Sequence, residues 1–203
     1  MILIDLLFHT DEYIKSIIQN FGSFSYVILF IIIFMETGIV FTPFLPGDSL
    51  LFASGIFASI GALNLFLLFF LFSVAAILGD TANYAIGHYF GNRIILKFIK
   101  TERVEMAKQF FEKHGKKTII FARFVPIVRT ITPFVAGIGK MNYFEFLFYN
   151  IVGGIAWVAL FLFSGFYFGG IPIIKENLSV VIIVIVIVSF LPLLIRYIKR
   201  SRR

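Results

Sequence analysis

The sequence predicts an all-α polytopic membrane protein, arranged as an inverted repeat with two opposed re-entrant helical hairpins plus spanning helices. Three observations predict this class. The 203-residue chain is 60% hydrophobic and only 14% charged, its mean hydropathy is +0.98, and prolines interrupt two of its long apolar segments. A soluble fold of this size cannot cover so much apolar surface. Lipid is therefore the expected solvent, and residues 1–203 are expected to form a single membrane domain.

Residues 1–20 are expected to form a short helix at the membrane interface. Ile14, Ile17 and Ile18 fall on one helical face, as in helices that lie along a bilayer surface. Asp5 precedes them, and the segment lacks both a basic beginning and a small-residue cleavage site. It is therefore not expected to be a signal peptide.

Residues 24–60 are expected to contain the first span and the first re-entrant hairpin. The apolar run 24–41 is about long enough to cross the hydrocarbon. Pro43 and Pro46 then interrupt the helix, and the apolar segment 50–60 is too short to span alone. The chain is predicted to enter the membrane here and to return to the same face.

The remaining elements repeat this order. They are a span over 62–90, a basic amphipathic cytoplasmic segment over 91–117, a second re-entrant hairpin over 118–140 broken by Pro126 and Pro133, a span over 143–168 and a C-terminal span over 178–195. Gly87 and Gly91 are four residues apart, a spacing that suits close packing of helices more than a functional role.

The distribution of basic residues predicts the topology. With both termini in the cytoplasm, the basic residues of 91–117 and 196–203 lie inside and Lys175 alone lies outside, as the positive-inside rule expects. The first hairpin then opens to the outer side and the second to the inner side. Such an inverted repeat recurs in transporters that bind their substrate near the midplane.

Four ionisable residues lie where charge is costly: Glu36 and Asp48 around the first hairpin, Arg123 and Arg129 in the second. Each unpaired charge would cost about 2.5–3.5 kcal/mol on the insertion scale. Broken backbone at this depth also needs protein or water around it. Both constraints predict one polar cavity shared by the acids and the arginines. Arginine suits phosphate oxygens, so Arg123 and Arg129 are the expected phosphate-binding residues.

Other residues receive supporting or structural interpretations. We hypothesise that protonation of Glu36 or Asp48 accompanies passage of the substrate. Asp80, Asn83 and Tyr84 are a candidate supporting polar cluster, while Trp157 is interpreted as a packing residue. The opposite interpretation stays open: the acids can be interfacial, the arginines can bind headgroup phosphates from the cytoplasmic side, and the prolines can be kinks within full spans.

An ordered set of motifs resembles the DedA family, also called the VTT or SNARE-associated family. The set consists of Glu36, Pro43-Phe44-Leu45-Pro46-Gly47-Asp48, Ser54-Gly55, Gly79-Asp80, Tyr84, Gly87, Gly91, Arg123-Phe124-Val125-Pro126-Ile127-Val128-Arg129, Ala136-Gly137, Asn150, Gly153 and Trp157. Any one piece is weak evidence, but the ordered set is specific and covers roughly residues 20 to 165.

The resemblance implies a multi-pass protein of the bacterial inner membrane that handles lipid. Family members recycle undecaprenyl phosphate, and others flip or scramble phospholipids such as phosphatidylethanolamine. The functional acids of the family fall on Glu36 and Asp48, and its functional arginines fall on Arg123 and Arg129. The expected partners are therefore a lipid substrate, protons and the membrane. A homo-oligomer stays open.

Two rival functions compete with a lipid flippase. A proton-coupled exporter of ions or small molecules would use the same acids. A lipid phosphatase would need a catalytic histidine beside arginine, and His9, His88 and His114 stand in no such motif. We therefore expect no enzyme activity, no catalytic residue, no cofactor and no metal, and we expect no nucleic-acid partner.

Overall fold

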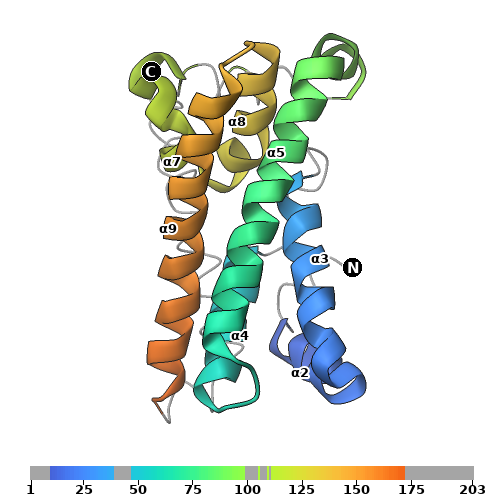
Figure 1. Ribbon diagram of the computed structural model, residues 1–203, viewed down its shortest axis with the longest axis vertical. Coiled ribbons are helices and arrows are strands. Elements are labelled where there is room, and N and C mark those ends of the chain that lie inside the picture. Colours follow the sequence, from blue (N-terminus) through green and yellow to red (C-terminus); the bar gives the residue numbers. More distant parts are fainter. Residues whose placement is uncertain (1–9, 39–46, 99–104, 106–108, 110, 172–203) are drawn as a thin grey trace, which may run out of the picture. The chain divides into compact units, whose positions relative to one another are not determined.

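The computed structural model describes residues 10–38, 47–98, 105, 109 and 111–171, and this part of the chain is helical without a strand (Figure 1). Its elements are α2 (Thr10–Phe21), η1 (Gly22–Phe24), α3 (Ser25–Gly38), α4 (Gly47–Ser59), α5 (Leu65–Phe98), η2 (Gly115–Lys117), α7 (Thr118–Ala122), α8 (Pro126–Ile138) and α9 (Tyr143–Gly169). The predicted all-α class is confirmed for these residues. The expected breaks at Pro43 and Pro46 and the expected span 178–195 lie outside them.

Three described stretches are long and apolar enough to cross a bilayer: Tyr13–Gly38, Leu65–Gly91 and Tyr143–Gly169. The chain is thus a membrane protein by length and composition of its helices. The re-entrant course of the two hairpins, the inverted repeat and the side on which each terminus lies stay predictions.

The chain divides into two compact units, which are described separately. One unit combines Met1–Phe30, Phe44–Phe72 and Val158–Arg203, and the other combines Ile31–Pro43 and Ser73–Trp157. We call them the first and the second unit. Helices α3, α5 and α9 contribute residues to both.

In the first unit, α2 ends in a turn that leads into α3. Gly22 has a φ of +51°, which glycine adopts without steric cost, and the Ser25 hydroxyl donates a hydrogen bond to the Gly22 carbonyl over 2.6 Å. As a result α2 lies crosswise to the start of α3 (Figure 1). The apolar stretch Tyr13–Gly38 is therefore two helices joined at a turn, with α2 in the region where an interfacial helix was predicted.

Helix α4 forms the core of the first unit. Every residue of α4 except Asp48 and Ser59 is buried. A Cβ added at Gly55 would lie 2.2 Å from the Leu162 carbonyl oxygen, and one at Gly165 would lie 2.0 Å from the Phe52 carbonyl oxygen. Such distances are far below van der Waals contact, so α4 and the end of α9 touch backbone to backbone, as small residues permit in membrane helices.

Helix α5 begins three residues later than the predicted span and extends beyond its predicted end. Gly61 has a φ of +77°, and the Ala62 amide donates to the Phe57 carbonyl over 3.0 Å, which closes the end of α4. Asn64 then caps α5 by accepting a hydrogen bond from the Leu67 amide. At the other end the helix passes through Gly91 to Phe98, because no proline interrupts it and Gly91 packs closely against Ile138.

In the second unit, α5 and α8 are in direct backbone contact. A Cβ at Gly87 would lie 2.2 Å from the Phe134 carbonyl oxygen, and a Cβ at Gly137 would lie 2.2 Å from the Tyr84 carbonyl oxygen. The glycine spacing that predicted close packing is thus matched by a partner glycine on α8. This contact fixes the register of α5 against α8, and with it the residues of α8 that the polar side chains of α5 face.

The two prolines predicted to break the second hairpin behave differently. Val125 is extended, with φ −125° and ψ 103°, and Pro126 opens α8, where its missing N–H costs nothing. Pro133 instead lies inside α8. The Thr132 hydroxyl donates to the Val128 carbonyl over 2.7 Å. This bond is local to the preceding turn, whereas Pro133 removes the helical N–H donor to the Arg129 carbonyl. Helix α8 nevertheless continues through Pro133, so the break is at residues 123–125 alone.

Candidate functional site

Arg123 lies in the turn between α7 and α8 and is buried, with 2% of its surface exposed. Its Nη2 atom donates to Asp80 Oδ2 on α5 and to Asn150 Oδ1 on α9, each over 2.5 Å. The turn at residues 123–125 directs the guanidinium inward, where it links three segments that are distant in sequence. A buried arginine is expected to be paired in this way.

Two glycines of α9 make room for the Arg123 side chain. A Cβ at Gly153 would lie 3.2 Å from Arg123 Cδ, and a Cβ at Gly154 would lie 3.4 Å from Arg123 Nη2. Larger residues at these positions would press on the arginine. The helix that supplies Asn150 therefore also supplies the space into which Arg123 extends.

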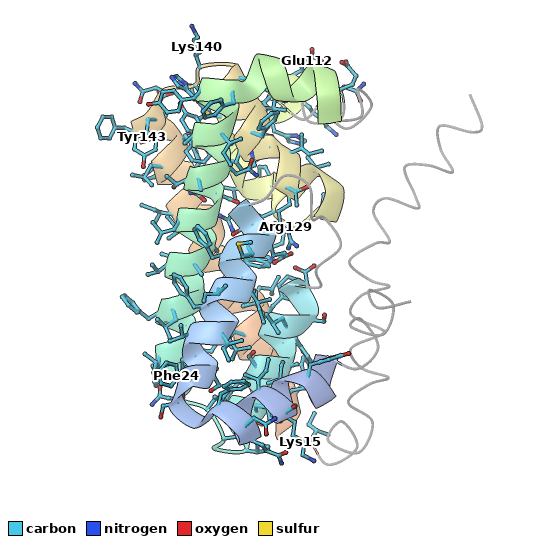
Figure 2. The ribbon with its side chains drawn as sticks, turned by 90° about the vertical axis from the view of Figure 1, so that its right-hand side faces the viewer. Lys15, Phe24, Glu112, Arg129, Lys140 and Tyr143 are labelled. Atoms are coloured by element: carbon cyan, nitrogen blue, oxygen red, sulfur yellow. The ribbon has the colours of Figure 1, made fainter. Side chains whose placement is uncertain are left out.

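Arg129 and Glu36 form the second buried ion pair. Arg129 lies in the first turns of α8 and Glu36 near the end of α3, with 6% and 1% of their surfaces exposed. Figure 2 shows the Arg129 side chain beside the end of α3. The pair was not predicted as such, although both residues were predicted to share a polar site.

Trp157 of α9 connects the two arginines. Its ring is fully buried, and its centroid lies 4.8 Å from Arg129 Cζ and 6.0 Å from Arg123 Cζ. Both distances are within the range of a cation–π interaction. The interpretation of Trp157 as packing alone was incomplete, because the indole faces both guanidinium groups.

The site is electrically balanced. Glu36 and Asp80 supply two carboxylates, while Arg123 and Arg129 supply two guanidinium groups. We call these four residues the charge cluster. Mutual pairing offsets the cost of burying charge only where the geometry is good and the remaining polar atoms are satisfied. Of the two expected acids, Glu36 pairs with Arg129, whereas the acid that pairs with Arg123 is Asp80, which was expected only as a supporting residue. A polar cavity shared by all four expected residues stays a prediction.

The pairing of Arg123 is incomplete. Its Nε and Nη1 atoms and the Asp80 Oδ1 atom are buried and have no hydrogen-bond partner in the structure. Unsatisfied buried polar atoms are uncommon in proteins and call for an explanation such as a ligand or water. The guanidinium can therefore donate to a further acceptor without releasing Asp80 or Asn150.

Asp48 lies in the first turn of α4, half-buried, in the first unit. Its proximity to the arginines of the second unit stays a prediction, as does its role in proton coupling.

Asp80, Asn83 and Tyr84 make separate contacts rather than one cluster. Asp80 pairs with Arg123. Asn83 Nδ2 donates to the Thr130 carbonyl over 2.7 Å. The Tyr84 hydroxyl donates to the Met141 carbonyl, and its ring stacks on Phe146. Residues three and four apart share a face of a helix, but these three side chains reach different partners along that face and tie α5 to three different places.

Asn150 is a site residue that was not predicted individually from the sequence. It stands in the apolar span predicted at 143–168, and it accepts from Arg123 while its Nδ2 donates to the Ile77 carbonyl over 3.0 Å. A lone amide in an apolar span is a recognisable signal, because it is costly there without a partner. The sequence contains no comparable feature that would predict the cation–π contacts of Trp157.

Helices that can cross a bilayer and a buried, charge-balanced arginine site define a polytopic membrane protein with an internal polar centre. The model of the VTT domain matches residues 45–167. The chain is 47% identical to Protein DedA of Escherichia coli strain K12 over 206 residues, covering 98% of this chain and 94% of the relative.

More distant relatives agree. The chain is 43% identical to an uncharacterized membrane protein of Mycobacterium leprae, covering 81% of this chain and 76% of the relative. It is 35% identical to the inner membrane protein YqjA of E. coli strain K12, covering 73% and 69%. No solved structure matches. The chain belongs to the DedA family of membrane proteins, which carry the VTT domain.

Proposed function

We propose that this protein is a lipid transporter that carries a phosphate-bearing lipid across the bilayer, and that it is not an enzyme. The first candidate substrate is undecaprenyl phosphate, returned for reuse as a carrier lipid. The second is a glycerophospholipid such as phosphatidylethanolamine. One relative is named an inner membrane protein, and we assign this chain to the same bacterial membrane.

One observation carries the proposal. Arg123 is buried and ion-paired, yet its Nε and Nη1 atoms have no partner. A guanidinium in this state is a ready donor for phosphate oxygens, which accept several hydrogen bonds at once. Arg129 lies close to the same indole ring and supplies a second positive charge.

Charge balance gives the proposed coupling to protons. The charge cluster carries two negative and two positive charges before a substrate enters. A phosphate monoester adds about −1.5 to −2 charges near neutral pH, and an uncompensated charge in a low-dielectric site is costly. Protonation of Glu36 or Asp80 offsets one unit of that added charge, and Asp48 is proposed to deliver the proton. Phosphatidylethanolamine has no net charge and imposes no such requirement.

The experiment is lipid translocation in proteoliposomes, with undecaprenyl phosphate in one arm and a labelled phosphatidylethanolamine in the other. We expect Arg123→Ala and Arg129→Ala each to lower translocation of the preferred lipid at least 100-fold, since each removes a phosphate contact. Lys15→Ala is the control, because Lys15 is exposed on α2 and belongs to neither the charge cluster nor the helices that carry it. Unchanged translocation in both arginine variants would reject the proposal.

Two further arms separate the alternatives. Collapse of the proton gradient should slow translocation of undecaprenyl phosphate and leave translocation of phosphatidylethanolamine unchanged. Flux of small solutes without movement of either lipid would instead identify a proton-coupled exporter.

A further inference from the structure

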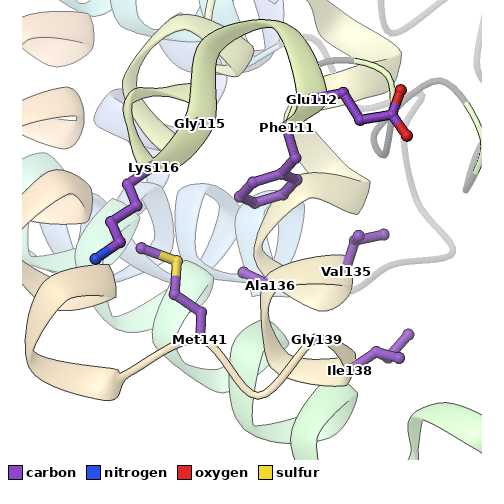
Figure 3. Close-up of a pocket in the computed structure, with 9 residues that line it drawn as sticks. All are labelled: Phe111, Glu112, Gly115, Lys116, Val135, Ala136, Ile138, Gly139 and Met141. Carbon is purple, nitrogen blue, oxygen red and sulfur yellow. The ribbon is translucent and has the colours of Figure 1, made fainter.

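A cavity of about 460 Å³ lies in the second unit, away from the charge cluster. It is lined by Phe111, Glu112, Gly115, Lys116, Val135, Ala136, Ile138, Gly139 and Met141. The volume is typical of a small-ligand site. Figure 3 shows Phe111 and Met141 facing the end of α8, while the Glu112 carboxylate points away. The wall is thus mainly apolar, with its charges at the edge.

The residues near the cavity have the composition of a membrane interface. Tyr143 and Phe144 follow the lining residues and are exposed, as are Tyr89 and Phe90 at the end of the span Leu65–Gly91. Exposed aromatic residues at the ends of spans mark the membrane interface. Figure 2 shows Tyr143, Lys140 and Glu112 at the same end of the second unit.

Lysines outnumber acids in the two segments that line the cavity. Residues 111–117 and 135–145 contain four lysines, at 113, 116, 117 and 140, and two glutamates, at 112 and 145. All four lysines are exposed. Lys116 Nζ lies 2.5 Å from Glu145 Oε1. Lys113, Lys117 and Lys140 are each next in sequence to a lining residue, so the segments around the cavity keep a net positive charge even when Glu112 is counted. Lysines beside a membrane surface attract anionic lipid headgroups.

We propose that this cavity is a binding site for an anionic membrane lipid, distinct from the transported substrate. An acyl chain occupies the apolar wall and the phosphate group lies among the nearby lysines. The surroundings determine the occupant. An apolar cavity at the edge of the hydrocarbon is in contact with lipid acyl chains, and the lysines near it favour lipids with negatively charged headgroups. Since Val135 to Gly139 form the end of α8, the lipid braces the helix that also carries Arg129.

The test is photocrosslinking with a phosphatidylglycerol that carries a diazirine in one acyl chain. The purified full chain in mixed vesicles is irradiated, and adducts are mapped by peptide mass spectrometry. We expect adducts on Phe111, Met141 and residues 135–139. Unlabelled phosphatidylglycerol should compete at least fivefold better than phosphatidylcholine, and high salt should reduce that preference because exposed charges are screened.

Matched variants locate the site. Val135→Trp fills the cavity and should lower the adduct yield at these residues at least fivefold. Val152→Trp is the control, because Val152 is exposed on α9 and outside the lining. Met141→Trp replaces Val135→Trp if the latter does not purify as folded protein. The triple variant Lys113→Gln, Lys117→Gln, Lys140→Gln should abolish the preference for phosphatidylglycerol.

Several results would overturn the proposal. These are adducts spread evenly over the exposed face, an equal yield in the cavity variants, equal competition by the two lipids, or a cavity protected by a second copy of the chain. The double variant Asp80→Asn, Arg123→Gln, which removes both charges of the buried pair together, should leave the cavity adducts unchanged. Loss of translocation in that variant with retained adducts therefore separates this site from the proposed transport function.

Discussion

Arg123 is the residue whose contacts constrain the site most. Its Nη2 atom is shared between a carboxylate on α5 and an amide on α9, while its Nε and Nη1 atoms are open. One end of the guanidinium therefore anchors the side chain and the rest is available. This division lets a single arginine hold the structure together and still accept a ligand.

Removing Asp80 should destabilise the protein more than removing Asn150. Asp80→Ala leaves the buried Arg123 charge uncompensated and should cost about 3–5 kcal/mol. Asn150→Ala removes one neutral acceptor from a charged donor and should cost about 1.5–3 kcal/mol. Thermal unfolding of the purified variants checks the order.

A double variant controls for that result. Asp80→Asn combined with Arg123→Gln removes both charges together and should recover much of the stability lost in Asp80→Ala. If the double variant is no more stable than Asp80→Ala, the ion pair is not the cause.

Trp157 should report on ligand binding at the arginines. It is the chain's one tryptophan, and its ring contacts both guanidinium groups. Binding of a phosphate lipid changes the field of those charges at the indole, so its fluorescence emission should shift on titration. Arg129→Ala, which removes the nearer cation, should abolish the shift. An identical shift in that variant would place the lipid elsewhere.

At the scale of elements, glycine pairs determine how closely the helices approach. Gly87 with Gly137 joins α5 to α8, and Gly55 with Gly165 joins α4 to α9. In each pair the added Cβ of one residue would overlap backbone of the partner helix. These contacts set the register of the polar residues, since a shift along α5 would move Asp80 away from Arg123.

Gly87→Ala and Gly137→Ala should each destabilise the protein. Alanine is the better helix former by about 1 kcal/mol, but the new methyl group would lie 2.2 Å from a backbone oxygen that no side-chain rotation can move. Forced overpacking costs about 1–3 kcal/mol or more, so the net effect should be a lower midpoint of thermal unfolding.

Gly170→Ala is the matched control, because the nearest atom to its Cβ is the Tyr167 carbonyl oxygen at 3.6 Å. Equal stability of all three variants would show that the helix contact is looser than the structure describes.

The sequence predicted which segments are helical and which charged residues belong to the site better than it predicted which of these residues pair with each other. The cost of charge in a membrane singled out Glu36, Arg123 and Arg129 without any coordinates. Which acid meets which arginine depends on the register of α5 against α8, and that register is set by backbone contacts that no local pattern encodes. The positions of the prolines did not predict the breaks on their own, because Pro126 opens α8 whereas Pro133 lies within the same helix.

At the scale of the whole molecule, topology is the prediction most open to direct test. The chain has no cysteine, so single-cysteine variants give unambiguous labelling. Lys140→Cys should be protected from a membrane-impermeant maleimide added outside the cell, and Lys175→Cys should react with it, because the charge distribution places them on opposite sides.

Ser201→Cys, near the C-terminus, should behave like Lys140→Cys. Reaction of Lys140→Cys and Lys175→Cys from the same side would contradict the predicted arrangement of spans.

The turn at residues 123–125 has a mechanical consequence. Helix α8 is fixed against α5 by the glycine contact, whereas the chain just before it is extended at Val125. A change of backbone torsion in this short connection would swing the guanidinium of Arg123 while leaving that contact intact. The side chain that links α5 to α9 is therefore also the one whose position depends most directly on the torsion angles of this connection.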